Sequence, residues 1–231
     1  MHLNDMENLS EQIAKHIGEQ IITGELVEGE RIQELRIAKE LDVSRGSVRE
    51  ALLLLERTHL IQIYPRRGAI VSEMSTQQIR GLFDSGVMVL SFIVQRISET
   101  WRVHEAAVLQ EIFTQLEQHA QQGNAEKFYD VFFQYMAEQH DMVANPYMVK
   151  FYRELLPSIR RSYFLTLNTS KRELQEALEL SKLLIDAILI RKSQQATLFM
   201  EDFCRHLCNL VLESLTRMKQ IELAWARRSR R

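Results

Sequence analysis

The stretch Val43-Ser-Arg-Gly-Ser-Val-Arg-Glu-Ala-Leu52 decides how the N-terminal part of this chain is interpreted. Ser44 is a good helix N-cap, because its hydroxyl can accept a hydrogen bond from a backbone N–H of the first turn. Arg45, Ser47 and Arg49 follow on the first turns of the predicted helix, and apolar residues dominate after them. One end of this helix can therefore meet an anion while the other end is held in a core, which is the arrangement of a DNA recognition helix.

The residues before this stretch predict the rest of a helix-turn-helix. Apolar residues recur at helical spacing from Leu9 to Ile22, and Gly24 is the predicted stop. A second helix is expected over 33–41, with a tight two-residue turn before Ser44. Two short helices joined by such a turn, the second opening with capping and basic residues, are typical of this motif.

The residues after it predict a basic hairpin. The short segments 60–64 and 69–71 are rich in β-branched residues, and Pro65-Arg-Arg-Gly68 lies between them as a turn. A hairpin beside a helix-turn-helix is a wing. Its two arginines can enter a minor groove or hold phosphates while the helix lies in the major groove.

These residues carry a family resemblance. The run from Glu34 to Leu52, followed by Arg67-Gly-Ala-Ile-Val71, resembles the winged-helix domain of GntR-family bacterial transcription regulators. The resemblance implies that Arg45 and Arg49 contact DNA and that Gly68 lets the wing backbone approach the groove. The residues predicted to contact DNA are Arg36, Ser44, Arg45, Ser47, Arg49, Arg66, Arg67 and Gly68.

Three positions depart from the family pattern. Asp42 stands where glycine is usual, Gly46 where proline is frequent, and Leu35 where arginine is frequent. Arg36, the next residue, has two readings: it replaces the phosphate contact of that missing arginine, or it makes no contact with DNA. Taken singly, the recognition-helix arginines also fit surface salt bridges, and the arginine pair of the wing fits a solvated turn. Their combination in one winged-helix pattern favours DNA binding.

Composition indicates a mainly α protein with two domains. The chain has 231 residues, with 45% hydrophobic and 26% charged residues, but only three prolines and eight glycines. We expect a DNA-binding domain over 1–75, a helical domain over 76–220 and a basic tail over 221–231. The formal net charge is only −2, so the DNA-binding interpretation depends on a local basic face.

The expected location is the cytoplasm. Cys204 and Cys208 lie four residues apart in one helical pattern, which favours reduced thiols. A metal site made of these cysteines and His206 is disfavoured, because His206 points to another side of the helix. There is no apolar run of membrane-spanning length and no signal-peptide pattern, so no membrane partner is expected.

The second domain is expected to be an all-α bundle, because apolar stripes at helical spacing recur throughout it. Helical patterns cover 79–97, 108–119, 125–144, 147–155, 158–167, 171–190 and 194–218. The arrangement, with Asp130, Phe133 and Asn145-Pro146, resembles the FCD domain of the FadR subgroup of the GntR family over about 77–215. Many members of that subgroup hold a divalent metal with one Asp and three His, and a small carboxylate effector lies on the metal.

The metal ligands carry over poorly to this chain. Asp130 matches the family's aspartate and His206 its third histidine, but Gln134 and Ser181 stand where the other two histidines are expected. Amide and hydroxyl groups bind transition metals weakly compared with imidazole. We therefore expect neither a metal nor another cofactor, with Asp130 and His206 as residual metal candidates that also fit a buried polar pair.

A cavity without a metal would suit a larger, apolar ligand such as an acyl chain, if it binds one. The alternative is that its aromatic and methionine side chains simply fill the core. The residues expected to line this effector pocket are Val87, Leu90, Asp130, Phe133, Gln134, Tyr163, Ser181, Phe203 and His206.

The sequence thus predicts a transcription regulator that binds double-stranded DNA. We expect a homodimer on a palindromic operator, acting as a ligand-responsive repressor. The alternative is a regulator whose bundle only dimerises and has no effector. An enzyme is not expected, because no nucleophile–base or catalytic metal motif is present. The arginines at the end of the chain fit a solvated tail better than a phosphate contact.

Overall fold

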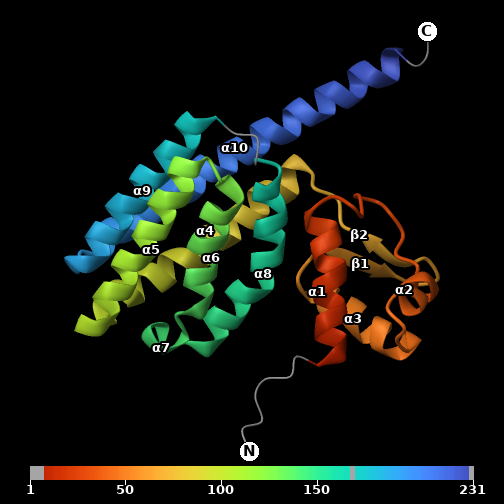
Figure 1. Cartoon of the computed structure of the whole chain (residues 1–231), viewed down its shortest axis with the longest axis horizontal. Helices are drawn as coiled ribbons and strands as arrows, with labels where there is room; N and C mark the ends of the chain where they lie inside the picture. Colours follow the sequence, from red (N-terminus) through yellow and green to blue (C-terminus); the bar gives the residue numbers. More distant parts are fainter. Residues whose placement is uncertain (1–7, 167–169, 229–231) are drawn as a thin grey trace, which may run out of the picture. The chain divides into compact units, whose positions relative to one another are not determined.

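The computed structural model describes residues 8–166 and 170–228. Its internal contacts divide the chain into two compact units, Met1–Met74 and Ser75–Arg231. Figure 1 shows the two-stranded sheet in the first unit and the long helices of the second. The predicted fold class, a winged helix-turn-helix followed by an all-α bundle, is confirmed.

The first unit places three helices around a small hairpin. Helix α1 packs on α3, and the buried face between them includes Ile17, Val48 and Leu55. The strands pair antiparallel, from Ile61 opposite Val71 to Tyr64 opposite Gly68, as a wing requires. The elements are α1 (Leu9–Ile22), α2 (Glu34–Glu40), α3 (Arg45–Arg57), β1 (Ile61–Tyr64) and β2 (Gly68–Val71).

The turn between α2 and α3 sets the start of the recognition helix. Asp42 has φ +53°, in the left-handed region where the family usually has glycine. Aspartate adopts this conformation more readily than most residues, because its short side chain can bond locally. Ser44 then takes an extended conformation and caps α3, accepting a hydrogen bond from the Ser47 N–H at 3.0 Å. The predicted cap is confirmed.

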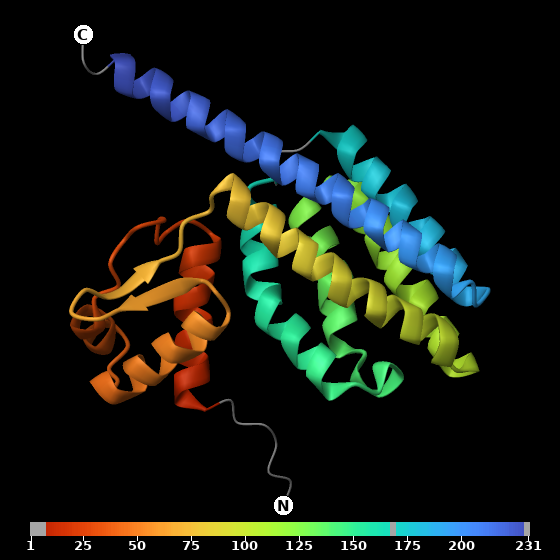
Figure 2. The ribbon, with the colours of Figure 1, turned by 180° about the vertical axis from the view of Figure 1, so that it is seen from behind.

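The second unit is a bundle built on α4. Figure 2 shows α4 beside the N-terminal part of α10, which continues beyond it, and α4 also packs against α8. By length and composition α4 could cross a membrane, and it is the one described helix that meets this test. The elements are α4 (Thr76–Thr100), α5 (Val103–Gln122), α6 (Ala125–Glu138), α7 (His140–Val143), α8 (Pro146–Phe164), α9 (Lys171–Leu189) and α10 (Ser193–Arg228).

The helix limits differ most from the sequence-based prediction in three places. The pattern over 125–144 is divided into α6 and α7 at Gln139. The patterns over 147–155 and 158–167 form one helix, α8, which continues through Pro157. Helix α10 runs to Arg228, so 221–228 of the expected tail is helical. The last three residues of that tail lie outside the described residues.

Candidate nucleic-acid interface and bundle interior

Two exposed arginines of α3 share one carboxylate. Arg49 Nε lies 2.9 Å from Glu34 Oε2, and Arg45 Nη2 lies 3.9 Å from the same oxygen. Glu34 is in the first turn of α2 and its side chain is 28% exposed, whereas the two arginines are 55% and 64% exposed. The Glu34 carboxylate therefore accepts a hydrogen bond from Arg49 Nε and lies within ion-pair distance of Arg45, while both arginine side chains remain more than half exposed.

Sequence reasoning missed Glu34. The sequence shows only that an acidic residue stands in the first turn of α2. Only the packing of α2 on α3 shows that this carboxylate reaches Arg49, fifteen residues further along the chain.

The two serines of the recognition helix serve its first turn. The Ser44 hydroxyl caps the helix and lies 2.9 Å from the Ser47 hydroxyl. Ser44 is exposed and Ser47 half-buried. Both retain oxygen lone pairs at the end of the helix where its unpaired N–H groups favour an anion.

The wing collects more guanidinium groups than the sequence suggested. Arg66 and Gly68 both have positive φ, +63° and +79°, which closes the turn and exposes the side chains of Arg66 and Arg67. The Arg67 guanidinium lies over the Tyr64 ring at 5.5 Å. Arg31 bridges to Ile70, and its guanidinium lies beside the Cα of Gly68, where a Cβ would meet it at 3.7 Å. Arg31 was not predicted as part of the wing.

The position of Arg36 favours neither reading of its role. Its Nε pairs with Glu40 Oε1 at 2.7 Å, and both side chains are more than half exposed. The hydrogen bond to Glu40 raises the pKa of Arg36, so the side chain carries its charge at any physiological pH. A phosphate would have to compete with Glu40 for this guanidinium.

The bundle interior is filled by aromatic rings. Phe132 stacks on Phe203 at 4.0 Å between ring centroids, Phe133 stacks on Tyr163 at 5.7 Å, and Tyr129 lies 5.3 Å from Tyr163. We call the following residues the aromatic cluster; each is at most 2% exposed: Phe128, Tyr129, Phe132, Phe133, Tyr163 and Phe203.

The structure distributes the predicted effector-pocket residues over several environments. Phe133, Tyr163 and Phe203 belong to the aromatic cluster, and Leu90 and Ser181 are buried. Val87, Asp130 and His206 are half-buried, and Gln134 is exposed.

Two surface hollows contain predicted pocket residues. Asp130, Gln134 and Tyr163 line one hollow of about 260 Å³, together with Leu156 and Arg160. Val87 lines another of about 450 Å³ between α4 and α10, together with Cys204 and charged side chains of both helices. The nine predicted residues therefore do not line a single hollow.

The donor set at the position of the family's metal does not fit a divalent ion. Asp130 accepts hydrogen bonds from Arg160 Nε at 3.0 Å and from the Tyr163 hydroxyl. His206 Nε2 lies 3.1 Å from the Glu173 carbonyl oxygen, and Nδ1 lies 3.6 Å from a Glu176 oxygen.

Gln134 and Ser181, at the other two ligand positions, are also hydrogen-bonded within the protein. Gln134 donates to Glu138 at 2.9 Å, and the Ser181 hydroxyl donates to the Ala177 carbonyl at 2.8 Å. Within the described ranges, no three His, Cys, Asp or Glu side chains are grouped to hold a metal.

One phenol of the aromatic cluster is unusual. The Tyr129 hydroxyl is buried and has no hydrogen-bond partner within the described part of the chain. Burial raises the pKa of Tyr129, and the nearby Glu173 carboxylate adds to the effect. The phenol is therefore neutral, and its hydroxyl lies buried among the rings of the aromatic cluster.

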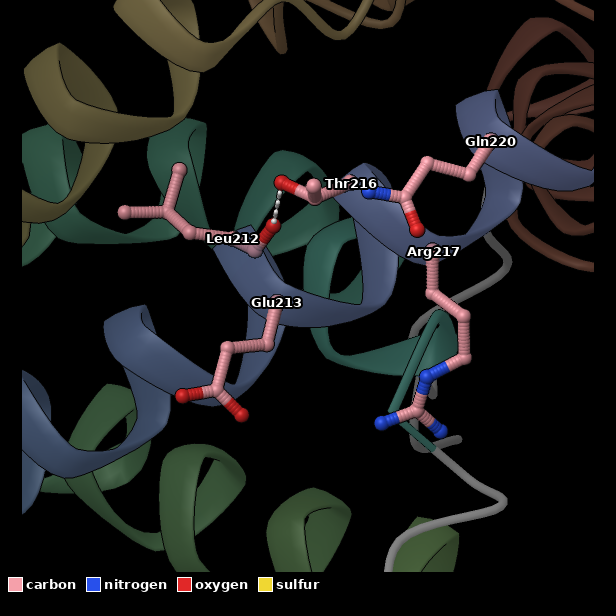
Figure 3. Close-up of a pocket in the computed structure, with 5 residues that line it drawn as sticks. All are labelled: Leu212, Glu213, Thr216, Arg217 and Gln220. Atoms are coloured by element: carbon pink, nitrogen blue, oxygen red, sulfur yellow. Dashed lines mark hydrogen bonds between the residues drawn. The ribbon is translucent and has the colours of Figure 1, made fainter. Parts of the chain in front are cut away.

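A further hollow, of about 380 Å³, lies along α10 alone (Figure 3). Leu212, Glu213, Thr216, Arg217 and Gln220 line it, and the Thr216 hydroxyl donates to the Leu212 carbonyl at 2.8 Å. Side chains of one helix enclose little, so this hollow is a feature of the helix surface.

Comparison with protein families identifies both units. The family model described as bacterial regulatory proteins, gntR family, matches residues 9–71. The FCD domain model matches residues 83–206, more than half of the chain.

Curated relatives are transcription regulators. The Escherichia coli regulator McbR is 26% identical over 128 residues, which cover 54% of this chain and 56% of McbR. The E. coli repressor RspR is 33% identical over 78 residues (34% of each chain), and the Bacillus subtilis gluconate operon repressor is 30% identical over 86 (37% and 35%). The chain thus matches only a third to about half of the length of these relatives.

Solved structures share the fold. The structure of E. coli McbR/YncC superposes with a TM-score of 0.77 at 20% identity, covering 91% of this chain and all of the other. A GntR transcriptional regulator from Rhodococcus sp. RHA1 gives a TM-score of 0.70 at 18% identity, covering 88% and 97%. At these identities the likeness speaks for the fold alone.

Proposed function

This chain belongs to the GntR family of bacterial regulatory proteins and carries an FCD domain, and from that premise we propose that it is a cytoplasmic, sequence-specific repressor that binds a pseudo-palindromic operator as a homodimer. The exposed pair Arg45 and Arg49 on a capped helix supports this proposal most directly. One recognition helix would enter the major groove at each half-site. The bundle would supply the dimer contacts.

The geometry of the hydrogen-bond donors decides which residues are assigned to bases and which to the DNA backbone. Arginine can donate two parallel hydrogen bonds to guanine O6 and N7, so Arg45 and Arg49 are assigned to base edges. Ser44, Ser47 and the wing residues Arg66 and Arg67 are assigned to the sugar–phosphate backbone, which fixes the register of the protein on the duplex. Gly68 gives the wing a close approach to the groove.

The test is a gel-shift titration of the operator with Arg49→Ala. Operator affinity should fall by roughly 1–3 kcal/mol, about 5- to 150-fold, if Arg49 donates to a guanine. Lys15→Ala, which removes one positive charge from α1 of the same unit, serves as the control. Unchanged affinity together with unchanged sequence preference would contradict the assigned role.

Two candidate forms of regulation differ in the bundle. In the first, a small apolar or acyl-type effector binds one arrangement of the dimer better than another and thereby changes operator affinity. In the second, the bundle only dimerises. The close stacking in the aromatic cluster, such as Phe132 on Phe203 at 4.0 Å, favours the second form.

A thermal-shift screen against metabolites separates these two forms. A ligand that binds the folded bundle raises its melting temperature by mass action, by an amount that grows with concentration. The effector-free form predicts no concentration-dependent rise for any metabolite. A saturable rise that also changes operator affinity would establish the ligand-responsive form.

A further inference from the structure

We propose that Arg160 supplies, at Asp130, the positive charge that metal-holding FCD domains obtain from a divalent ion, so that an internal ionic crosslink between α6 and α8 takes the place of the metal. Asp130 lies on α6 and Arg160 on α8, thirty residues apart in the chain. This inference concerns the bundle and does not depend on the proposed DNA-binding function.

The contacts at Asp130 form a compact ionic cluster. Arg160 Nε donates to Asp130 Oδ1 at 3.0 Å, and Arg160 Nη2 lies 3.9 Å from Glu126 Oε1, one helical turn before Asp130. The buried Tyr163, one turn after Arg160, donates its hydroxyl to the same Asp130 oxygen. Two helices are thus joined through one carboxylate, which receives a guanidinium and a phenol.

Burial strengthens this cluster relative to an ordinary surface pair. The side chains of Arg160 and Asp130 are 26% and 33% exposed, and Tyr163 is 1% exposed. Burial, together with its hydrogen bond to Asp130, raises the pKa of Tyr163 well above its usual range, so the phenol remains a donor. Hydrogen bonds to a charged acceptor are shorter and stronger than those between neutral groups.

A divalent ion would be opposed by the same geometry. It would have to share the Asp130 carboxylate with both donors and lie next to the fixed charge of Arg160, since arginine cannot lose its proton in a protein. The remaining three positions of the family's ligand set offer no compensation. Gln134 and Ser181 are bonded within their own helices, and His206 is bonded to α9.

A double-mutant cycle in the full chain tests the crosslink. Arg160→Met leaves the Asp130 carboxylate uncompensated, and Asp130→Asn removes the partner charge of Arg160, so each should lower the melting temperature of the bundle by about 3–6 °C. The double variant should lose clearly less than the two single losses combined. If Arg160→Met does not fold, Arg160→Gln, which removes the charge and keeps a polar side chain, replaces it in the cycle.

Arg205→Met is the matched control. Arg205 pairs with Asp202 on the surface of α10 with side chains 67% and 45% exposed, so its loss should leave the melting temperature nearly unchanged. Strictly additive losses at Arg160 and Asp130, or an effect no larger than that of Arg205→Met, would overturn the crosslink.

Calorimetric titration with Ni²⁺, Zn²⁺ and Mn²⁺ tests the metal directly. After dialysis against EDTA, the wild-type protein should show no metal binding that depends on Asp130 and an unchanged melting temperature. Stoichiometric binding that stabilises the wild type and is abolished by Asp130→Asn would overturn the proposal. Neither readout involves DNA, so a failure here is distinguishable from a failure of the proposed function.

Discussion

In the proposed DNA interface, the acidic residue Glu34 positions the two arginines of α3. A carboxylate next to phosphates is unfavourable by charge alone. Here, however, it holds Arg45 and Arg49 and so reduces the number of side-chain conformations that the two arginines explore. Preorganised donors lose less conformational entropy on binding, and discrimination between bases improves because fewer alternative contacts are within reach.

Glu34→Gln should therefore reduce specificity while raising the affinity for unrelated DNA. The substitution keeps the side-chain shape but removes the negative charge, so attraction to any phosphate backbone increases. The ratio of operator affinity to affinity for an unrelated duplex should fall about two- to fivefold, the range expected of an exposed ion pair. Fluorescence anisotropy at fixed salt measures both affinities.

Glu40→Gln is the matched control for this experiment. It also removes an acidic charge from α2, but Glu40 pairs with Arg36 and not with the recognition helix. A Glu34→Gln ratio equal to that of Glu40→Gln would show that charge, and not positioning, accounts for the effect.

The two cysteines should react at very different rates. Burial raises the pKa of Cys204 to about 12, and burial also raises the pKa of the half-buried Cys208. The thiolate is the reactive form, so at pH 8 iodoacetamide should modify Cys208 slowly and Cys204 only after unfolding. Mass spectrometry of the native and urea-unfolded protein measures this order. Equal labelling of both cysteines in the native protein would contradict it.

The same pKa shift gives a pH dependence of stability. The unfolded Cys204 thiol loses its proton near its ordinary pKa of 9.0, whereas the folded thiol keeps it until about pH 12. Between pH 9 and 12 the folded state therefore binds more protons than the unfolded state. The contribution of the Cys204 thiol to the free energy of unfolding is present below pH 9 and falls as the pH rises toward 12.

Helix α3 begins where its cap dictates. The Ser44 hydroxyl accepts from the Ser47 N–H, one of the donors that a helix start leaves unpaired. Ser44→Ala should lower the free energy of unfolding of the first unit by about 1 kcal/mol, the usual cost of losing such a cap. Urea unfolding followed by circular dichroism measures it. Ser47→Ala, which keeps the cap, should cost less; an equal or larger cost would contradict the account.

Local signals predicted the first unit well. A cap, a periodic apolar face and a turn with two arginines each have a short-range cause, so the helices and the hairpin were expected within a few residues of their observed limits. The positive φ of Asp42 also has a local cause, because aspartate adopts the left-handed region more readily than most residues. Contacts between elements, such as those of Glu34 with α3 and Arg31 with the wing, needed the fold.

Two features of the bundle could not be predicted from the sequence: the continuity of α8 and the packing of the expected pocket. Pro157 suggested a helix boundary, because proline removes a backbone donor and disfavours a helical conformation in the residue before it. Yet α8 continues through it, with Leu155 and Ile159 buried on either side, which indicates that packing outweighs the local cost. The pocket could not be predicted either, since whether aromatic rings line a cavity or fill it depends on their packing.

The whole molecule combines a winged helix-turn-helix unit with a helical bundle. The GntR match and the FCD match lie in different units, and each unit has its own core. A monomer would present one recognition helix, whose contacts cover a single short half-site. A dimer presents two, and the symmetry of the protein is then mirrored in the operator.

The measurement that tests this most directly is selection of bound duplexes from a random DNA pool by the wild-type protein and by Arg49→Ala. The wild type should enrich one motif of two inverted half-sites with centres about one helical turn, or a multiple of it, apart. Arg49→Ala should lose the preference at the guanine position of each half-site and keep the spacing. Enrichment of no motif, or of the same motif by both proteins, would contradict the recognition role of α3.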